Sequence, residues 1–175
     1  MSFLKTLFSG GTKSRLRAPE ADDLFNSGRQ HYAKQNYREA FKCFSVAADQ
    51  GHADSQGLLG VMYDNGQGVT RDFKSAVKWF RLAADQENAL GQFGLGVMYR
   101  DGHGVTQDYD EAATWIGRAA DQGLADAQFN LGVMFLYGHG VAQSIRDASK
   151  WWRRAADQGN ANAKTNLAAL ASRGY

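Results

Sequence analysis

The chain has one cysteine, one proline and no long apolar run among its 175 residues. Because Cys43 stands alone, neither an intrachain disulfide nor a thiolate metal cluster can form, which suits a reducing compartment. No run of about 18 apolar residues predicts a membrane-spanning helix. The opening MSFLKTLFSGG has too short an apolar stretch for a secretory signal, and Ser2 excludes N-myristoylation. We therefore expect a cytoplasmic protein.

Outside the first residues, neither positive nor negative charge predominates. Residues 1–19 contain four basic side chains and no acidic one, whereas the remainder has 16 basic and 18 acidic residues. A nucleic-acid-binding body needs a clustered cationic surface to displace counterions from phosphates. The sequence therefore predicts no nucleic-acid partner.

Motifs for chemistry are also missing. There is no nucleophile–base pattern, phosphate loop or paired-carboxylate motif. His103 and His139 lie in successive G-H-G-V loops, but those loops contain no further ligand that would complete a metal site. We interpret both histidines as exposed turn residues. The sequence predicts no catalytic site, no metal and no cofactor.

What the sequence does contain is a repeat. The block LGVM, then G-x-G-V, then a tryptophan-bearing segment ending in AADQ occurs three times at an offset of 36 residues. A fixed period of this size indicates stacked supersecondary units that share one continuous core. The positions in register are Gly60, Gly96 and Gly132; Gly68, Gly104 and Gly140; and Trp79, Trp115 and Trp151.

Each unit fits two amphipathic helices, exemplified by 53–64 and 73–85. The second helix of each unit follows a residue that favours the N-cap position, and two of these residues precede a glutamate by three positions, as in a capping box. Large residues alternate with glycine and alanine, which permits close helix packing. The N-cap residues are Asn36, Asp72, Asp108 and Ser144, and the capping-box glutamates are Glu39 and Glu111.

The segment before these units is shorter by four residues between its helices, and the final segment repeats only a first helix. That lone helix is expected to cover the apolar end of the stack. Cys43 takes the place of the tryptophans and is predicted to be a buried packing residue, as they are. The predicted division is a leader 1–19, a short unit 20–52, full units 53–88, 89–124 and 125–160, and a capping helix 161–175.

Residues 24–48, LFNSGRQHYAKQNYREAFKCFSVAA, resemble a tetratricopeptide repeat, and residues 53–160 are similar to the Sel-one-like repeat family. Ser144 and Phe135 depart from that family's usual Asp and Tyr. The resemblance implies an all-α, right-handed α/α superhelical solenoid of antiparallel helix pairs, with about nine helices. It also implies a bacterial adaptor that binds proteins without catalysing a reaction.

In related solenoids the first helices line the concave side, and an asparagine there holds the backbone or carboxylate of a bound peptide. The corresponding side chains combine amides at both ends of the groove with an apolar middle. The asparagines also fit a mere consensus role, and the phenylalanines also fit packing between helices. The predicted groove residues are Asn26, Arg29, Val61, Phe93, Val97, Arg100, Phe129, Asn130, Val133 and Asn166.

Three further features leave alternatives open. Gly91 and Gly94 have three possible explanations: a ligand that approaches the helix closely, a locally flexible stretch of helix, or neutral drift at positions that are not under selection. The leader, with Phe3, Leu4 and Lys5, suits weak peripheral contact with an anionic inner membrane, docking onto the protein itself, or disorder. Our main hypothesis is a non-catalytic adaptor. The rivals are a membrane-associated assembly factor and a protein or enzyme that recognises cell-wall fragments.

Overall fold

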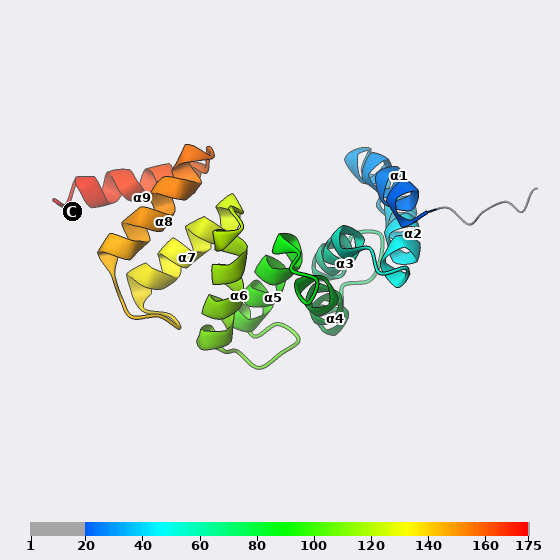
Figure 1. The fold of residues 1–175 in the computed structure, drawn as a ribbon, viewed down its shortest axis with the longest axis horizontal. Coiled ribbons are helices and arrows are strands. Elements are labelled where there is room, and N and C mark those ends of the chain that lie inside the picture. The colour runs from blue at the N-terminus through cyan, green and yellow to red at the C-terminus, as the bar shows by residue number, and fades with distance from the viewer. Residues whose placement is uncertain (1–19, 175) are drawn as a thin grey trace, which may run out of the picture.

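The computed structural model describes residues 20–174, which form nine α-helices arranged as successive antiparallel pairs (Figure 1). The predictions for the leader 1–19 lie outside the described residues. The pairs stack into the right-handed α/α solenoid that the sequence predicted. The helices are α1 (Ala21–Ala33), α2 (Tyr37–Asp49), α3 (Ala53–Asn65), α4 (Phe73–Ala84), α5 (Ala89–Asp101), α6 (Tyr109–Asp121), α7 (Ala125–Tyr137), α8 (Ile145–Asp157) and α9 (Ala161–Ala171).

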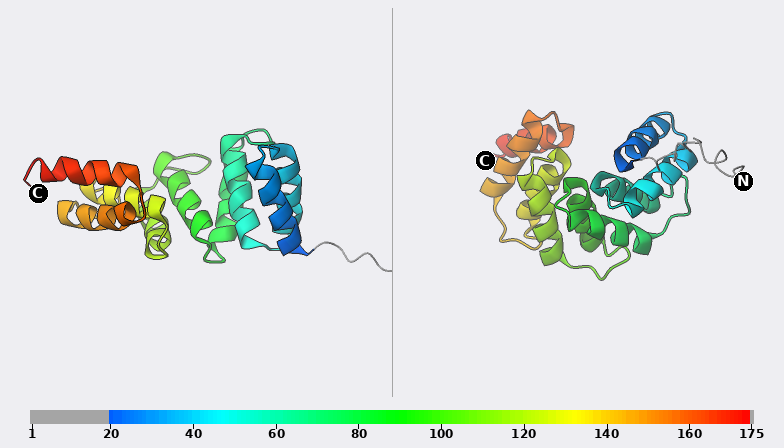
Figure 2. Two further views of the ribbon diagram at one scale, coloured as in Figure 1. Left: turned by 90° about the horizontal axis from the view of Figure 1, so that it is seen from above. Right: turned by 45° about the vertical axis from the view of Figure 1, so that its right-hand side comes forward.

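The stack bends into an arc whose hollow side is formed by the first helix of each pair. The two views in Figure 2 place α3, α5 and α7 on the inside of the bend and α4, α6 and α8 on the outside. In agreement with this, α3 contacts α5 directly across the concave side. The predicted groove helices therefore do line the concave surface.

Three of the four predicted N-caps cap their helices. The side chains of Asp72, Asp108 and Ser144 accept hydrogen bonds from backbone N–H groups in the first turns of α4, α6 and α8. Asn36 precedes α2, but its side chain makes no capping bond. The first helices have caps of their own, because His52, Asn88 and Asn160 accept from the first turns of α3, α5 and α9.

The predicted capping boxes are incomplete. Asp108 accepts from the backbone N–H of Glu111 at 3.0 Å, but the return bond expected from each glutamate side chain does not form within the described residues, so that part of the expectation was wrong. Each glutamate has a different partner one turn further along its helix. Glu39 pairs with the ammonium of Lys42 at 2.8 Å, and Glu111 accepts from the indole Nε1 of Trp115 at 3.0 Å. A charge-assisted bond to a cation, or one to an indole N–H, outcompetes the return to the N-cap backbone.

Within each unit, a glycine of the first helix lies against a large side chain of the second. A Cβ built on Gly60 would come within 2.5 Å of the Phe80 ring, and one on Gly96 within 2.6 Å of Ile116. Gly132 and Trp152 repeat the arrangement at 2.5 Å. Only glycine lets these helices approach so closely, which is why it recurs every 36 residues.

Each G-x-G-V loop connects the two helices of its own unit and packs against the preceding unit. Their second glycines adopt positive φ and lie against the backbone at the start of the preceding second helix, at Tyr37, Phe73 and Tyr109. The residue between the glycines contacts the same region. His103 stacks on Phe73 at 4.3 Å and His139 stacks on Tyr109 at 4.5 Å. Both histidines therefore contact the preceding unit. His103 is nevertheless an exposed loop residue, as the sequence predicted, whereas His139 is half-buried.

The glutamine that ends each AADQ segment bonds to a buried glutamine on the first helix of its own unit. Gln86 donates to Gln56 at 2.7 Å, Gln122 to Gln92 at 2.8 Å, and Gln158 to Gln128 at 2.9 Å. The three acceptors are buried, at 5%, 4% and 5% exposure. A buried amide is costly unless it is hydrogen-bonded, so each pair ties the end of the second helix to the first helix of the same unit. Gln122 and Gln158 also donate to the carbonyl oxygens of Glu87 and Gly123 in the preceding unit, both at 2.8 Å.

The tryptophans and the cysteine are less buried than expected. Trp79, Trp115 and Trp151 are half-buried, and each packs against the core cluster of the preceding unit. Arg118 and Arg154 cover the outer faces of the last two rings at 4.6 and 4.5 Å. Cys43 is likewise half-buried, because it sits at the edge of the first pair with its Sγ 3.7 Å from Ser27 Oγ.

The last helix covers the end of the stack. Trp152 on α8 is 1% exposed and packs with Ala163 and Leu170 of α9. Its indole Nε1 donates to the carbonyl oxygen of Phe129 at 3.1 Å. Removal of α9 would expose a large apolar ring and half of this cluster.

We predict that Gly132→Leu destabilises the protein by roughly 1–3 kcal/mol, because the new side chain overpacks the contact with Trp152. Chemical unfolding followed by circular dichroism measures this change. Gly117→Ala in α6 is the matched control, since no atom lies within 4 Å of a Cβ there. That variant should gain about 0.5–1 kcal/mol from helix propensity. Equal midpoints for both variants would refute the packing scheme.

We also predict that deletion of 161–175 causes aggregation, because it uncovers Trp152. Size-exclusion chromatography and binding of a hydrophobic dye report the effect. A chain that lacks only 173–175 leaves α9 intact and should behave as the full protein does. A monomeric 1–160 chain of undiminished stability would show that α9 is no cap.

Candidate binding groove

The concave surface contains an apolar hollow between α3 and α5, with a volume of about 140 Å³. It unites three of the residues predicted from the sequence, namely Val61, Phe93 and Val97. We call it the N-terminal hollow. Its lining residues are Val61, Asp64, Asn65, Phe80, Leu90, Phe93, Gly94, Val97 and Met98.

Gly94 packs directly on the Phe80 ring that forms the floor of this hollow. A Cβ at position 94 would lie 2.4 Å from the ring of Phe80, so the ring occupies the space that a side chain would take. Gly91, one turn earlier, packs in the same way against Ala83 of α4. Both glycines are thus explained by the close approach of α4. Of the three explanations that the sequence left open, this is nearest to close approach, although the approaching group belongs to the protein itself.

The next position along the groove, between α5 and α7, is bridged by a polar pair. The guanidinium of Arg100 donates to Asn130 Oδ1 at 2.5 Å and pairs with Asp101 at 2.7 Å. Asn130 Nδ2 donates in turn to the carbonyl oxygen of Asp126 at 2.8 Å. Asn130 therefore keeps one donor hydrogen and one acceptor lone pair for a partner.

A second hollow, of about 270 Å³, lies between α7 and α9. It brings together Val133 and Asn166 of the predicted set, with the edge of Trp152 beneath them. We call it the C-terminal hollow. Its lining residues are Val133, Leu136, Tyr137, Trp152, Asn166, Ala169, Leu170 and Arg173.

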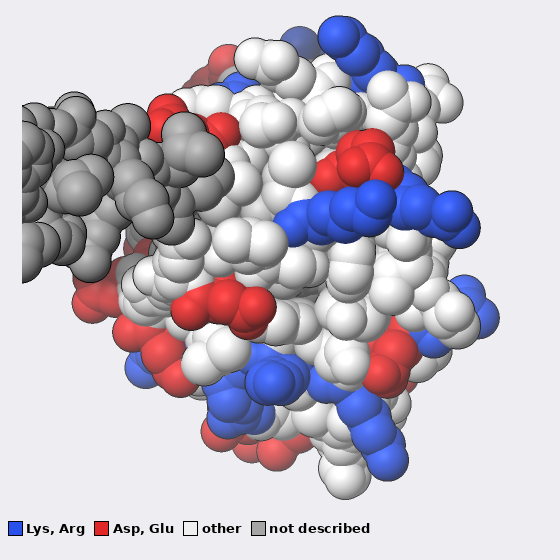
Figure 3. Space-filling view, turned by 90° about the vertical axis from the view of Figure 1, so that its right-hand side faces the viewer, with Lys and Arg blue, Asp and Glu red and all other residues white. Residues whose placement is uncertain are grey.

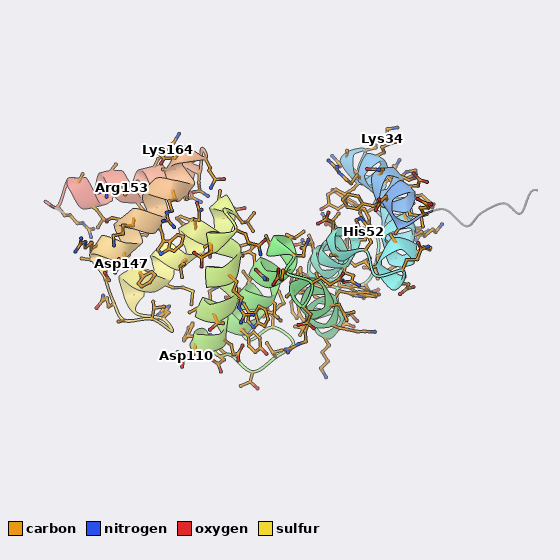
Figure 4. The ribbon with its side chains drawn as sticks, viewed as in Figure 1. Lys34, His52, Asp110, Asp147, Arg153 and Lys164 are labelled. Atoms are coloured by element: carbon orange, nitrogen blue, oxygen red, sulfur yellow. The ribbon has the colours of Figure 1, made fainter. Side chains whose placement is uncertain are left out.

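The remaining predicted residues lie apart from the two hollows. Asn26 and Arg29 are exposed on α1, where the Arg29 guanidinium lies over the Phe25 ring at 5.6 Å. The Phe25 ring lies 4.5 Å from the ring of His52 and is tilted against it by 35°. His52 is the N-cap residue of α3 and is labelled in Figure 4. Phe129 is half-buried and packs against the cluster of α8 and α9, so its contacts serve the core. Val97 and Phe93 combine core contacts with exposure to the N-terminal hollow.

The groove carries isolated charged side chains. Asp64 lines the N-terminal hollow without an ion pair to any residue in 20–174, and partial burial raises the pKa of its carboxyl. The pKa of Asp101 is lowered, mainly by its hydrogen bond with Arg100. At the end of the molecule shown in Figure 3, acidic and basic side chains are interspersed among uncharged surface. That face carries no single-signed field.

A larger, polar depression of about 740 Å³ lies outside the groove, at the C-terminal ends of α4 and α6. Its main polar groups are already engaged with one another. Gln122 donates to Gln92, and Arg118 lies over the ring of Trp115. We therefore keep the concave groove as the candidate site.

Two other kinds of site are absent from residues 20–174. No group of three or more histidine, cysteine, aspartate or glutamate side chains is arranged to hold a metal ion. No helix in the same range is long and apolar enough to cross a membrane. Of the nine and eight residues that line the two hollows, five were in the predicted set and twelve were not, among them Asp64, Leu90, Leu136 and Arg173.

Comparison with known proteins identifies the repeat. The family model of the Sel1 repeat matches residues 24–52, 53–88, 89–124 and 125–160. It thus also matches the first unit, whose sequence resembled a tetratricopeptide repeat. No curated protein matches the chain.

Solved structures with the same fold come from bacteria. Escherichia coli c5321, a protective antigen of uropathogenic strains with an SLR fold, is 34% identical with a TM-score of 0.81 over 89% of this chain. A Sel1 repeat protein from Oxalobacter formigenes is 31% identical with a TM-score of 0.74 over 82%. The chain spans 34% and 59% of those two proteins. Helicobacter pylori cysteine rich protein B, 20% identical, has a TM-score of 0.60; the match covers 73% of this chain and 96% of that protein.

The two aspartates at the groove predict opposite effects of pH on stability. Burial raises the folded pKa of Asp64 above its ordinary 3.8, so its charge destabilises the fold at neutral pH. Asp64→Asn should therefore stabilise the protein at pH 7, by less than about 1 kcal/mol because the group is partly solvated. The gain should fade as pH drops through the folded pKa and should be lost below 3.8, where the carboxyl becomes protonated in both states.

Asp101→Asn is the matched control. Its folded pKa is lowered, so its charge contributes stability above the unfolded pKa, and this contribution is lost as pH falls through the folded pKa. The variant should be less stable than wild type at pH 7, with a difference that narrows in acid. Urea unfolding at several pH values measures both. The same sign for both variants at pH 7 would contradict this account of the groove.

Proposed function

Since the chain belongs to the Sel1 repeat family, we propose that it is a non-catalytic adaptor that holds an extended or helical segment of a partner protein in its concave groove. Proteins of this family are typically scaffolds for protein–protein interaction. The Escherichia coli and Oxalobacter formigenes relatives are longer than this chain, which spans only 34% and 59% of them. Any activity that would need a protein of that length is therefore part of the proposal.

The observation that carries the proposal is the N-terminal hollow. It is an open, mainly apolar depression on the concave side of a solenoid, and the buried Phe80 ring, packed against Gly94, forms its floor. Apolar side chains of a partner segment gain free energy when they leave water for such a surface, by about 25 cal/mol per Å² buried. The hollow suits an anchor side chain better than it suits a reaction.

The polar groups of the groove support the same function. Asn130 has hydrogen-bonding capacity left after its contacts with Arg100 and Asp126. Asn166 lines the C-terminal hollow and makes no side-chain hydrogen bond to another residue in 20–174. Amides at these positions can donate to and accept from the backbone of a peptide whatever its sequence.

The test is affinity capture with three variants of the full chain. Val97→Asp places a charge in the N-terminal hollow and should reduce partner recovery at least tenfold. Asn130→Ala removes one hydrogen bond and should cost roughly 0.5–1.5 kcal/mol. Lys78→Ala, an exposed change on α4 outside the groove, is the control. Val97 also packs in part against the core, so the melting temperature of each variant must be measured alongside.

One pattern of results would refute the proposal. If Lys78→Ala weakens capture while folded Val97→Asp and Asn130→Ala do not, the partner binds the outer surface. The alternative of a membrane-directed factor depends on residues 1–19. Co-sedimentation of the full chain and a 20–175 chain with vesicles of anionic lipid distinguishes it.

A further inference from the structure

The two hollows are the same structural site, displaced by two repeat units. Val61 and Val97 of the first correspond, 72 residues on, to Val133 and Ala169 of the second. Phe80 and Met98 correspond in the same way to Trp152 and Leu170. Each hollow therefore has two small apolar residues on its walls and a large ring at its floor.

The charges at the two rims are opposite. Asp64 lines the N-terminal hollow, whereas the equivalent residue of the C-terminal hollow is Leu136. Arg173 lines the C-terminal hollow. Neither Asp64 nor Arg173 forms an ion pair with a residue in 20–174, so both charges are available to a bound group.

The position between the hollows is neutral and closed. Arg100 is neutralised by Asp101 and donates across the groove to Asn130, so side chains fill the equivalent space between α5 and α7. A bound segment would pass over this bridge and contact it through its backbone. The groove thus offers two anchor sites separated by a polar span.

The geometry gives the spacing of the anchors. The hollows are two first-helix positions apart, and packed helices lie about 8–10 Å from each other, so the separation is roughly 20 Å. An extended chain covers about 3.3 Å per residue, so two anchor side chains would stand about six residues apart.

We propose that the partner segment is an extended peptide with two apolar side chains about six residues apart, a basic residue beside the anchor in the N-terminal hollow and an acidic residue beside the anchor in the C-terminal hollow. This inference rests on the proposed function and adds the chemistry and polarity of the segment. Complementary charges at the two ends would fix the register and direction of binding.

Synthetic peptides test the inference with the full chain. The basic–acidic probe carries two leucines about six positions apart, a lysine outside the first and a glutamate outside the second, with Gly and Ser elsewhere. Matched probes carry two lysines, two glutamates, or serines in place of the leucines. Fluorescence polarisation of labelled peptide gives each Kd.

The basic–acidic probe should bind best, and replacement of its leucines by serine should abolish measurable binding. Asp64→Asn and Arg173→Ala should each weaken this probe by roughly three- to tenfold. The decisive variant is Asp64→Lys, which should prefer the two-glutamate probe. Because Asp64 and Arg173 carry no internal ion pair, these variants should fold as wild type does, and circular dichroism verifies this.

The outcomes separate this inference from the proposed function. Binding that is lost with Val97→Asp but ignores charge would overturn the polarity and keep the groove. Binding that Asp64→Lys leaves unchanged in preference overturns it too, as does absence of binding by every probe, while partner capture still tests the adaptor function. A peptide of residues 1–19 is included as a rival occupant. Tighter, Val97-dependent binding of that peptide would replace the proposed partner by the chain's own leader.

Discussion

The close contact between a first-helix glycine and a second-helix ring determines most of this structure. Where a Cβ would stand at Gly28, Gly60 and Gly132, an aromatic ring of the paired helix already lies within 2.5 Å. Ile116 fills the same role opposite Gly96. The helices can approach only because the glycine has no side chain, and the ring fills the space that remains. Each unit therefore has one tight seam, around which its other contacts are arranged.

The glycine–ring contacts hold the two helices of each unit together, whereas polar and aromatic contacts join the units to one another. On one side, buried glutamines reach the preceding unit, as Gln128 does when its Nε2 donates to the carbonyl oxygen of Ala120. On the other side, loop residues reach back to the preceding helix pair, as His103 does when it stacks on Phe73. Misaligned units would leave a buried amide unpaired, which costs about 1–3 kcal/mol. The curvature that forms the groove is held by these contacts as much as by the apolar core.

The sequence predicted most structural features that repeat every 36 residues and missed most of those that occur only once. The 36-residue period was enough for the fold class, because anchors such as Gly96 must repeat wherever the same helix packing repeats. It also placed Val61 and Val97 on one surface. The glutamine pairs recur too, but a polar residue at a helix end gave no hint of burial, since its partner lies 30 residues away. Asn36 failed as a cap although its type was right, because a side-chain bond depends on local backbone angles.

The candidate site depends on departures from the repeat, which explains why repeat-based reasoning found only part of it. Asp64 and Arg173 have no counterpart of like charge at the equivalent hollow position, so comparison between units passes over them. Gly94 is the clearest case. Asn130 and Asn166 take its place in later units, and a glycine within a helix costs about 0.5–1 kcal/mol relative to alanine. Here the glycine has a structural reason, because the missing side chain makes room for the buried Phe80 ring beneath the groove. A regular array supplies the curved surface, and single irregular positions give each part of that surface its own chemistry.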